Sequence, residues 1–253
     1  MLVGININFA KFILDSAKDL TPLNSKQSFQ ICSLGWPDLL FTPADAEKQL
    51  SNLFNDETPK ELNFSESARI KDYHGLRFDG NLACPKWFFS SLNAKLVVLD
   101  IKVLHGEELI ADLGAPNSVD PLKEGFDLVI DNGTIEHIFN IPQAMSNIAS
   151  LVRLGGVVVH SNPFLMPNHG FWSINPIMYF DFYESNGFKL ETVLIVSNYN
   201  DKRISLSREQ FYKRFRFGKI EECCIWTVAK RLSRVENQFV FPTQTKYRQM
   251  LST

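Results

Sequence analysis

The chain has 253 residues, of which 45% are hydrophobic and 21% are charged, and its formal net charge is −2. Such a chain buries a large core and is not disordered over most of its length. Its balanced charge excludes a global positive field for nucleic acid or acidic membranes, so an anionic ligand must be met locally. The four cysteines form neither a CxxC pair nor a disulfide framework, and the apolar run at 2–10 is shorter than a membrane span and lacks a basic leader. We therefore expect a cytoplasmic protein without a membrane anchor.

The first predicted strand and helix come early in the chain. Residues 28–34 form a short β-prone run that ends at Gly35. A threonine–proline pair then has the pattern of an N-cap and a first helical position, and predicts a helix over 44–53. Residues 56–94 lack clear periodicity and are expected to form an insertion or lid within a single domain that spans 1–253.

From residue 95 onward, apolar runs alternate with helical patterns. Continuous apolar runs that end in aspartate are typical of strands buried on both faces. Strands alternating with helices at this spacing predict a three-layer α/β fold with a mostly parallel sheet, whose ligand lies at the carboxyl ends of the strands. The expected strands are 96–100, 109–112, 126–131, 157–160, 190–196 and 223–229, and the expected helices are 140–154 and 176–186.

Two segments carry a resemblance to a known family. Phe-Asp-Leu-Val-Ile-Asp-Asn-Gly-Thr-Ile-Glu-His at 126–137 and Leu-Val-Arg-Leu-Gly-Gly-Val-Val-Val-His at 151–160 resemble the fourth-strand and fifth-strand regions of class I S-adenosylmethionine-dependent methyltransferases. The specific part of the resemblance lies within 95–188. It implies a Rossmann-like fold, here with an insertion between the first two strands. Residues 133–140 and 168–172 are most similar to a bacterial subgroup associated with surface-polysaccharide biosynthesis.

The resemblance implies S-adenosylmethionine as the cofactor. Asp100, at the end of the second strand, can accept both ribose hydroxyls of an adenosyl group. After the third strand, Asp112 would accept the adenine amine while Leu113 packs against the ring. Each aspartate taken alone is more typical of a turn or cap, and only Asp100, Asp112 and Asp131 together, in this order, favour a cofactor. The cofactor-binding residues predicted in this way are Gly35, Asp100, Ile101, Asp112, Leu113, Asp131, Asn132 and Gly133.

The first turn departs from the family's pattern. The family usually has several glycines there, whereas this chain has Gly35 alone between Ser33 and Asp38. Asp100 also follows Gly35 at far more than the roughly 20 residues of a dinucleotide-type fingerprint, so an insertion is needed. A noncatalytic binding or scaffold protein that keeps the fold is therefore the alternative.

Two histidines are the candidate catalytic residues. Methyl transfer from a sulfonium is an in-line displacement, so the enzyme aligns the acceptor and removes a proton from its hydroxyl or amine. His137 follows the fourth strand and His169 lies in the loop after the fifth, and either could act as the base. A structural histidine is the alternative for each. The predicted acceptor-binding residues are Glu136, Asn162 and Arg214.

Three further patterns bear on the acceptor. Asn-Pro-Phe at 162–164 superficially resembles a motif of nucleic-acid amino-methyltransferases, but it follows the wrong strand and lacks the second proline. Residues 201–219 hold seven basic and two acidic residues, which could bind a phosphorylated acceptor or form a solvated amphipathic helix. The histidines and aspartates show no metal-ligand spacing, so no metal is predicted, although a site assembled from distant loops stays open.

These observations together predict an S-adenosylmethionine-dependent O-methyltransferase. The expected acceptor is a small hydroxylated or phosphorylated molecule, with a sugar or sugar-nucleotide precursor of a capsule or other surface polysaccharide as the leading class. A protein or nucleic-acid methyltransferase is the third alternative. Nucleic acid is disfavoured because the chain has no second basic patch or stacking motif, and the sequence leaves the oligomeric state open.

Overall fold

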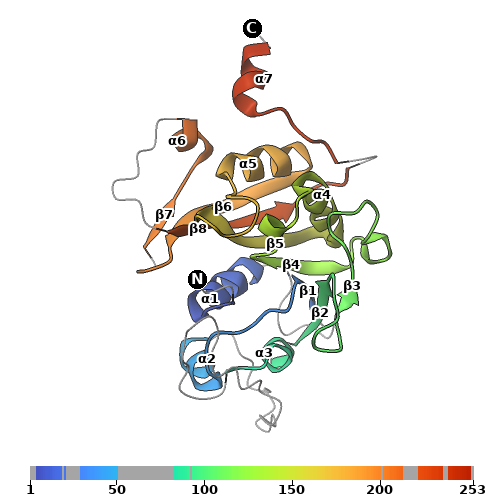
Figure 1. Ribbon diagram of the computed structural model, residues 1–253, viewed down its shortest axis with the longest axis vertical. Helices are drawn as coiled ribbons and strands as arrows, with labels where there is room; N and C mark the ends of the chain where they lie inside the picture. The colour runs from blue at the N-terminus through green and yellow to red at the C-terminus, as the bar shows by residue number, and fades with distance from the viewer. Residues whose placement is uncertain are drawn as a thin grey trace. The chain divides into compact units, whose positions relative to one another are not determined.

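The chain divides into two compact units, Met1–Ile110 and Ala111–Thr253, each built of strands and helices (Figure 1). No helix in the described part of the chain is long and apolar enough to cross a membrane. The computed structural model describes residues 4–18, 20, 29–50, 82–91, 93–200, 202–212, 222–235 and 239–251.

The first unit contains a parallel sheet. Strand β1 pairs in parallel with β2, with Leu34 opposite Leu99, and β2 pairs in parallel with β3. Helix α3 packs against β2. Helices α2 and α3 both lie between β1 and β2 in the chain, which agrees with the insertion predicted there. The elements of this unit are α1 (Ile7–Ala17), β1 (Phe29–Leu34), α2 (Pro43–Leu50), α3 (Pro85–Ser91), β2 (Ala94–Asp100) and β3 (Leu109–Ile110).

Helix α1 is the element that the sequence analysis did not predict. The side chain of Asn6 caps it by accepting a hydrogen bond from the backbone N–H of Phe9 at 2.9 Å. Its buried residues recur at three- and four-residue intervals, so one stripe of the helix faces the core. These residues are Phe9, Ala10, Ile13, Leu14 and Ala17.

Helix α2 begins where the sequence predicts. The hydroxyl of Thr42 accepts from the N–H of Asp45 at 3.1 Å, and the Asp45 carboxylate accepts from the N–H of Thr42 at 3.0 Å. This is a capping box with aspartate in the place of glutamate. The last three residues of the predicted helix lie outside the described residues, as does most of the predicted insertion at 56–94. Within that range, residues 85–91 form α3.

The second unit contains a mixed sheet with the order β4-β5-β8-β6-β7. Strands β4 and β5 are parallel, whereas β8 pairs antiparallel with both β5 and β6, so β6 runs in the same direction as β4 and β5. Helices α4 and α5 lie on one side of this sheet (Figure 1). The elements are η3 (Asp120–Leu122), β4 (Phe126–Asn132), η4 (Ile135–His137), α4 (Ile141–Leu151), β5 (Val152–Leu165), α5 (Pro176–Ser185), β6 (Phe188–Ser197), β7 (Arg203–Ser205), α6 (Arg208–Tyr212), β8 (Cys223–Arg231) and α7 (Thr245–Leu251).

The boundary between α4 and β5 differs from the prediction. The helix predicted over 140–154 ends at Leu151, and β5 begins at Val152. Val152 pairs with Phe126 of β4, so a contact far away in sequence decides its conformation. Gly156 lies within this strand, where a β-carbon would be 2.8 Å from the carbonyl oxygen of Asp127. Gly156 therefore allows close strand pairing, and the two glycines do not end the helix.

The predicted fold class is confirmed. Strands β1, β2 and β3 pair in parallel, as do β4 and β5, and the antiparallel strands β8 and β7 occur late in the chain. Strand β4 is buried over Phe126–Asp131, as its continuous apolar run predicts. The arrangement is a mixed α/β architecture consistent with the Rossmann-like class I methyltransferase fold.

Candidate active site

Three predicted cofactor-binding residues lie at one edge of the sheet in the first unit. Gly35 directly follows β1 with φ +79°, and its N–H donates to the carbonyl of Leu99 at 2.7 Å. Asp100 ends the neighbouring parallel strand and accepts a hydrogen bond from the N–H of Lys102 at 3.3 Å. The side chain of Ile101 is exposed. The structure thus brings Gly35, Asp100 and Ile101 to the same carboxyl edge.

An aromatic pair lies in the same unit and was not predicted. The rings of Trp36 and His105 are stacked, with centroids 4.0 Å apart and planes 15° apart. His105 Nδ1 is 2.8 Å from Glu108 Oε1, and the His105 N–H donates to the same carboxylate at 2.8 Å. Burial raises the pKa of Glu108, but backbone N–H groups and the His105 ring outweigh it and lower the pKa to about 2. The sequence signal was a histidine three residues before a glutamate, after β2.

Asp112 and Leu113 open the second unit. The exposed Asp112 carboxylate accepts the N–H of Gly114 at 2.8 Å and so closes a turn, which is the structural alternative for a single aspartate. Leu113 is buried, and Asn147 Nδ2 donates to its carbonyl at 2.8 Å. The adenine contacts predicted for these two residues remain predictions.

Asp131 is the centre of a buried polar network. Its Oδ2 is 2.7 Å from Nδ1 of His160 and accepts from Nδ2 of Asn162 at 3.0 Å. Its Oδ1 accepts from the N–H of Thr134 at 3.1 Å. His160 Nε2 lies 2.5 Å from the hydroxyl of Tyr183 on α5. The carboxylate therefore holds the turn after β4 through Oδ1 and two side chains of β5 through Oδ2, in a position closed to solvent.

The two residues after Asp131 continue this turn. Asn132 is half-buried at the end of β4. The N–H of Gly133 donates to the carbonyl of Ser161 on β5 at 2.9 Å. The turn is thus attached to the neighbouring strand.

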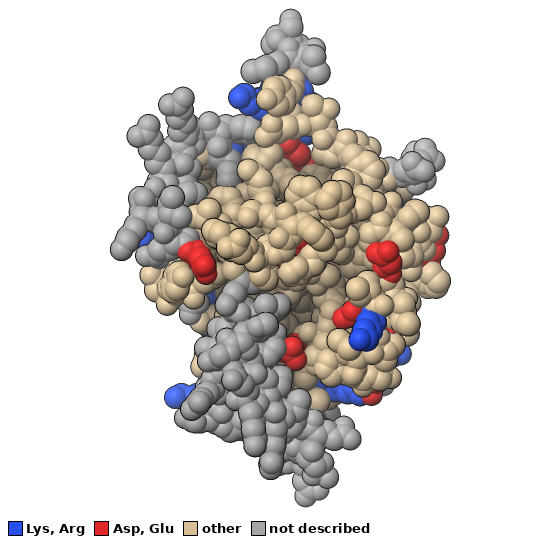
Figure 2. Space-filling model, viewed as in Figure 1, with Lys and Arg blue, Asp and Glu red and all other residues tan. Residues whose placement is uncertain are grey.

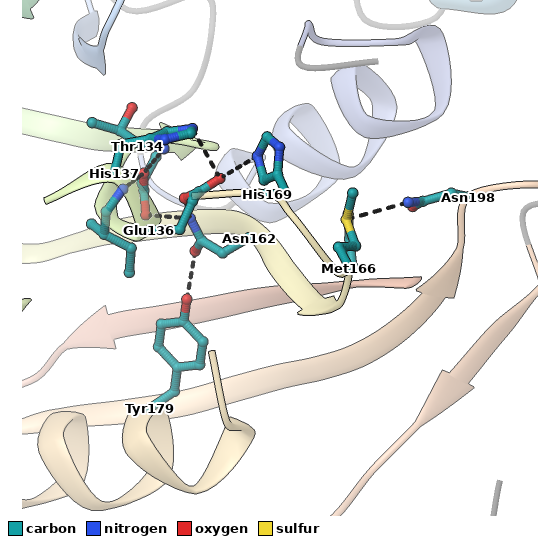
Figure 3. Close-up of polar contacts among 11 residues, drawn as sticks. Thr134, Glu136, His137, Asn162, Met166, His169, Tyr179 and Asn198 are labelled. Carbon is teal, nitrogen blue, oxygen red and sulfur yellow. Dashed lines mark hydrogen bonds and ion pairs between the residues drawn. The ribbon is translucent and has the colours of Figure 1, made fainter. Parts of the chain in front are cut away.

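Glu136, His137 and His169 converge at the carboxyl ends of β4 and β5 (Figure 3). Glu136 Oε1 is 3.2 Å from His169 Nε2 and 3.9 Å from His137 Nε2. The imidazole centroids are 5.0 Å apart. Glu136 is fully buried, whereas the side chain of His169 is 18% exposed and that of His137 is 50% exposed. The cluster therefore has a buried carboxyl group on its inner side and an outer edge that a ligand can reach.

Gly170 brings the loop after β5 onto η4. It has φ +66°, and a β-carbon there would lie 2.8 Å from the carbonyl oxygen of Glu136. The N–H of Phe171 donates to that same carbonyl at 2.8 Å, and Trp172 Nε1 donates to the carbonyl of Ile138 at 3.2 Å. These backbone contacts, and not hydrophobic periodicity, place His169 beside Glu136.

Asn162, predicted to bind the acceptor, lies beneath the cluster. Its Nδ2 donates to both Asp131 and Glu136 at 3.0 Å, and its Oδ1 accepts from the hydroxyl of Tyr179. Burial, followed by the charges of the nearby carboxylates, raises the pKa of Tyr179 well above its usual value, so this hydroxyl stays a donor. Asn162 is fully buried and braces the two carboxylates. Arg214 lies outside the described residues.

Three exposed aromatic rings adjoin the cluster and were missed by the sequence analysis. In the loop after β4 and in the loop after β5, a histidine is followed two residues later by a phenylalanine. The pairs are His137 with Phe139, and His169 with Phe171. The ring centroid of Phe139 is 5.8 Å from that of Phe171 and 5.7 Å from that of Trp172. The exposed fractions are 74% for Phe139, 66% for Phe171 and 39% for Trp172. We call these three residues the aromatic cluster.

Charged side chains give no further pointer to the ligand. On the face shown in Figure 2, the lysines, arginines and acidic residues of the described surface are scattered and form no patch. Arg208, from the predicted basic segment, is 2.7 Å from Glu184 and 3.4 Å from Asp181. Its charge is already neutralised, so it does not provide a phosphate site.

No family model matches the chain, and no curated protein matches it in sequence. Several solved structures resemble it. A 1,6-didemethyltoxoflavin-N1-methyltransferase from Burkholderia thailandensis, crystallised with 1,6-didemethyltoxoflavin and S-adenosylhomocysteine, is 9% identical, with 87% of this chain and 79% of that chain covered and a TM-score of 0.36.

Two other solved structures resemble the chain with similar TM-scores. An S-adenosylmethionine-dependent methyltransferase from Archaeoglobus fulgidus is 10% identical, with 87% of this chain and 94% of that chain covered and a TM-score of 0.40. The CurJ carbon methyltransferase is 14% identical, with 88% of this chain and 53% of that chain covered and a TM-score of 0.41. At these TM-scores, the likenesses assign no residue roles to this chain.

Proposed function

We propose that the chain is an S-adenosylmethionine-dependent methyltransferase that acts on a small molecule, with the acceptor bound at Glu136, His137 and His169. One observation carries the proposal: these three side chains meet at the carboxyl ends of β4 and β5. Ligands of open α/β sheets bind at that end of the strands. The sequence resemblance independently assigns the same loops to the acceptor.

The first unit supplies residues that fit the adenosyl part of the cofactor. Gly35 has a positive φ directly after β1, and Asp100 carries a carboxylate at the end of the parallel neighbour. This carboxylate would accept the ribose hydroxyls, and the exposed Ile101 would pack against the base. When bound, S-adenosylmethionine supplies a methyl group on a sulfonium. Asp112, Leu113, Asn132 and Gly133 complete the proposed set, with Asp131 holding the turn.

The acceptor class remains the one that the sequence predicts. A sugar or sugar-nucleotide precursor of a surface polysaccharide is supported by the resemblance of the two histidine loops to that bacterial subgroup. The aromatic cluster adds a physical reason, because exposed rings beside a polar centre can cover the apolar face of a ring-shaped ligand. A hydroxyl is the proposed methylated group. A phosphate contact would have to come from outside the described residues, for example from Arg214.

The proposal is tested by thermal unfolding with and without S-adenosylhomocysteine. At 100 times its dissociation constant, a ligand adds about 2.7 kcal/mol to stability, which for this length corresponds to a shift of roughly 5 to 10 °C. The protein must be folded and free of copurified cofactor. We expect Asp100→Ala to lose most of the shift, whereas Asp120→Ala keeps it, because Asp120 pairs at the surface with Lys123.

The alternative is a noncatalytic protein with the same fold, and the single glycine of the first turn favours it. If the folded 253-residue chain shows no shift at millimolar S-adenosylhomocysteine, that result supports this alternative. If the unfolding temperature rises equally in the parent chain and in Asp100→Ala, the chain binds the cofactor but Asp100 is not part of the binding site. A shift lost only in Asp100→Ala supports the proposed enzyme, and sugar nucleotides are then the first acceptors to assay.

A further inference from the structure

We infer that Glu136, His137 and His169 bind a divalent transition-metal ion such as Zn²⁺. One carboxylate and two imidazoles are a common ligand set for such ions. The role that we give the ion, which is to hold the acceptor, rests on the proposed function. The binding of the ion itself does not, because it depends on these three side chains alone.

The distances suit one shared ion. One possible ligand atom from each residue lies within 4.8 Å of the other two. Ligand atoms bonded to one ion at about 2.0–2.2 Å are about 3 Å or slightly more apart. Glu136 Oε1 and His169 Nε2 already have this separation, at 3.2 Å. His137 Nε2 is 3.9 Å from the same oxygen and sits on a half-exposed side chain that can rotate inward.

The surroundings of the Glu136 carboxylate favour the binding of a cation. Among the described residues, the only groups within ion-pair distance of its carboxylate are the two histidines. A second buried carboxylate, that of Asp131, shares the Asn162 amide with it. Burying a carboxylate is costly unless it is paired with a cation or coordinates a metal. A divalent ion held by Glu136 Oε1 removes this imbalance.

The residues beneath Glu136 resemble the support of a metal ligand. Carboxylates that bind metals are themselves hydrogen-bonded, which fixes their orientation. Asn162 Nδ2 holds Glu136 Oε2 at 3.0 Å, and the Tyr179 hydroxyl holds Asn162 in turn (Figure 3). The other oxygen, Oε1, is thereby directed toward both imidazoles.

The site has three protein ligands and an accessible side. Metal sites that act on substrates keep an open position beyond three protein ligands. His137 is half-exposed there, and the aromatic cluster adjoins it. An acceptor hydroxyl bound to the ion has a lowered pKa, and its proton passes to water. His137 and His169 then serve as ligands, and the ion takes over the activation of the acceptor that the sequence analysis gave to a histidine base.

Cobalt binding tests the site without cofactor or acceptor. Untagged, chelator-treated protein is titrated with Co²⁺, and the visible absorption of the bound ion is followed, with Zn²⁺ as the competitor. We expect one ion per chain. His137→Ala and His169→Ala should each weaken binding by about tenfold or more. Circular dichroism and thermal unfolding show whether each variant is folded, and His137→Ala serves even if His169→Ala is unstable, because His137 is half-exposed.

His105→Ala is the matched control. His105 also lies 2.8 Å from a buried glutamate, but no third ligand completes a cluster there in the described part of the chain. Its removal should leave Co²⁺ binding unchanged. Absence of saturable absorption, unchanged affinity in His137→Ala, or equal loss in His105→Ala would each overturn the inference. S-adenosylhomocysteine binding is measured separately in the presence of chelator. The experiments therefore distinguish a chain that binds no metal from a chain that binds no cofactor.

Discussion

Gly170 passes so close to Glu136 that a β-carbon on Gly170 would lie 2.8 Å from the Glu136 carbonyl oxygen. Gly170→Ala should therefore combine the strain of a positive φ with a steric clash, and lower the free energy of unfolding by about 2 to 4 kcal/mol. Denaturant unfolding measures this loss. In the cobalt titration, the same variant should bind the ion more weakly.

Gly106→Ala separates the two causes. Gly106 also has a positive φ, +89°, but a β-carbon there would meet nothing within 4 Å. Only the backbone strain remains, so a loss of about 1 to 2 kcal/mol is expected. Equal losses in the two alanine variants would mean that the contact with Glu136 has no energetic weight.

Asn162→Ala should be among the most destabilising changes in the second unit. The variant leaves the buried carboxylates of Asp131 and Glu136 without a shared donor, and the Tyr179 hydroxyl without its acceptor. Groups stranded in this way cost about 1 to 3 kcal/mol each, and more when charged. We expect a loss of about 2 to 4 kcal/mol in denaturant unfolding.

An asparagine in the turn directly after β6 provides the control. Asn198 is exposed, and its amide donates to the sulfur of Met166 at 3.4 Å, a weak acceptor. Asn198→Ala should change the stability by no more than about 0.5 kcal/mol. A similarly small loss in Asn162→Ala would show that the buried network rearranges around the missing amide.

Tyr183→Phe tests the other end of this network. His160 Nε2 is 2.5 Å from the Tyr183 hydroxyl, and both side chains are fully buried. Without the hydroxyl, the imidazole nitrogen loses its partner, at a cost of about 1 to 3 kcal/mol. Tyr199→Phe is the control, because Tyr199 is 70% exposed. If Tyr183→Phe is as stable as the parent chain, the Tyr183 hydroxyl does not contribute to stability.

The sequence correctly predicted the helices and strands whose structure is decided by residues close to them in the chain. The continuous apolar run of β4 gave its bounds to within one residue, and the threonine cap gave the start of α2. The predicted end of α4 was wrong, because Val152 continues the helical spacing of the apolar residues, whereas its actual pairing partner, Phe126, is distant in sequence. Helix α1 has a sequence signal in its Asn6 cap and in the three- and four-residue spacing of its apolar residues.

The candidate site was predictable as a set of residues but not as an arrangement. Glu136, His137 and His169 were each selected from their places after strands, yet their convergence depends on the turn at Gly170, which leaves no periodic signal. Asn162 was expected to face the acceptor. It is buried instead, because α5 brings Tyr179 over it, and helix packing of that kind is not visible in a single sequence.

Glu108 makes the stability of the first unit dependent on pH. Its pKa is lowered to about 2, against an ordinary value of 4.5, because hydrogen bonds from backbone N–H groups and His105 outweigh the effect of burial. The folded state therefore binds the proton more weakly than the unfolded state does. The resulting stabilisation is fully present above the ordinary pKa and is lost as the pH falls from there toward about 2.

Glu108→Gln should accordingly be less stable than the parent chain at neutral pH, and the gap should narrow as the pH falls below about 5. Denaturant midpoints of both proteins, measured from neutral pH down to the lowest pH at which they remain folded, check this. Glu107→Gln is the neighbouring control. Glu107 is exposed and forms a surface ion pair with the exposed Lys86, so its replacement should have little effect at any pH. A gap between Glu108→Gln and the parent chain that stays constant with pH would show that packing, not the charge of Glu108, stabilises the loop after β2.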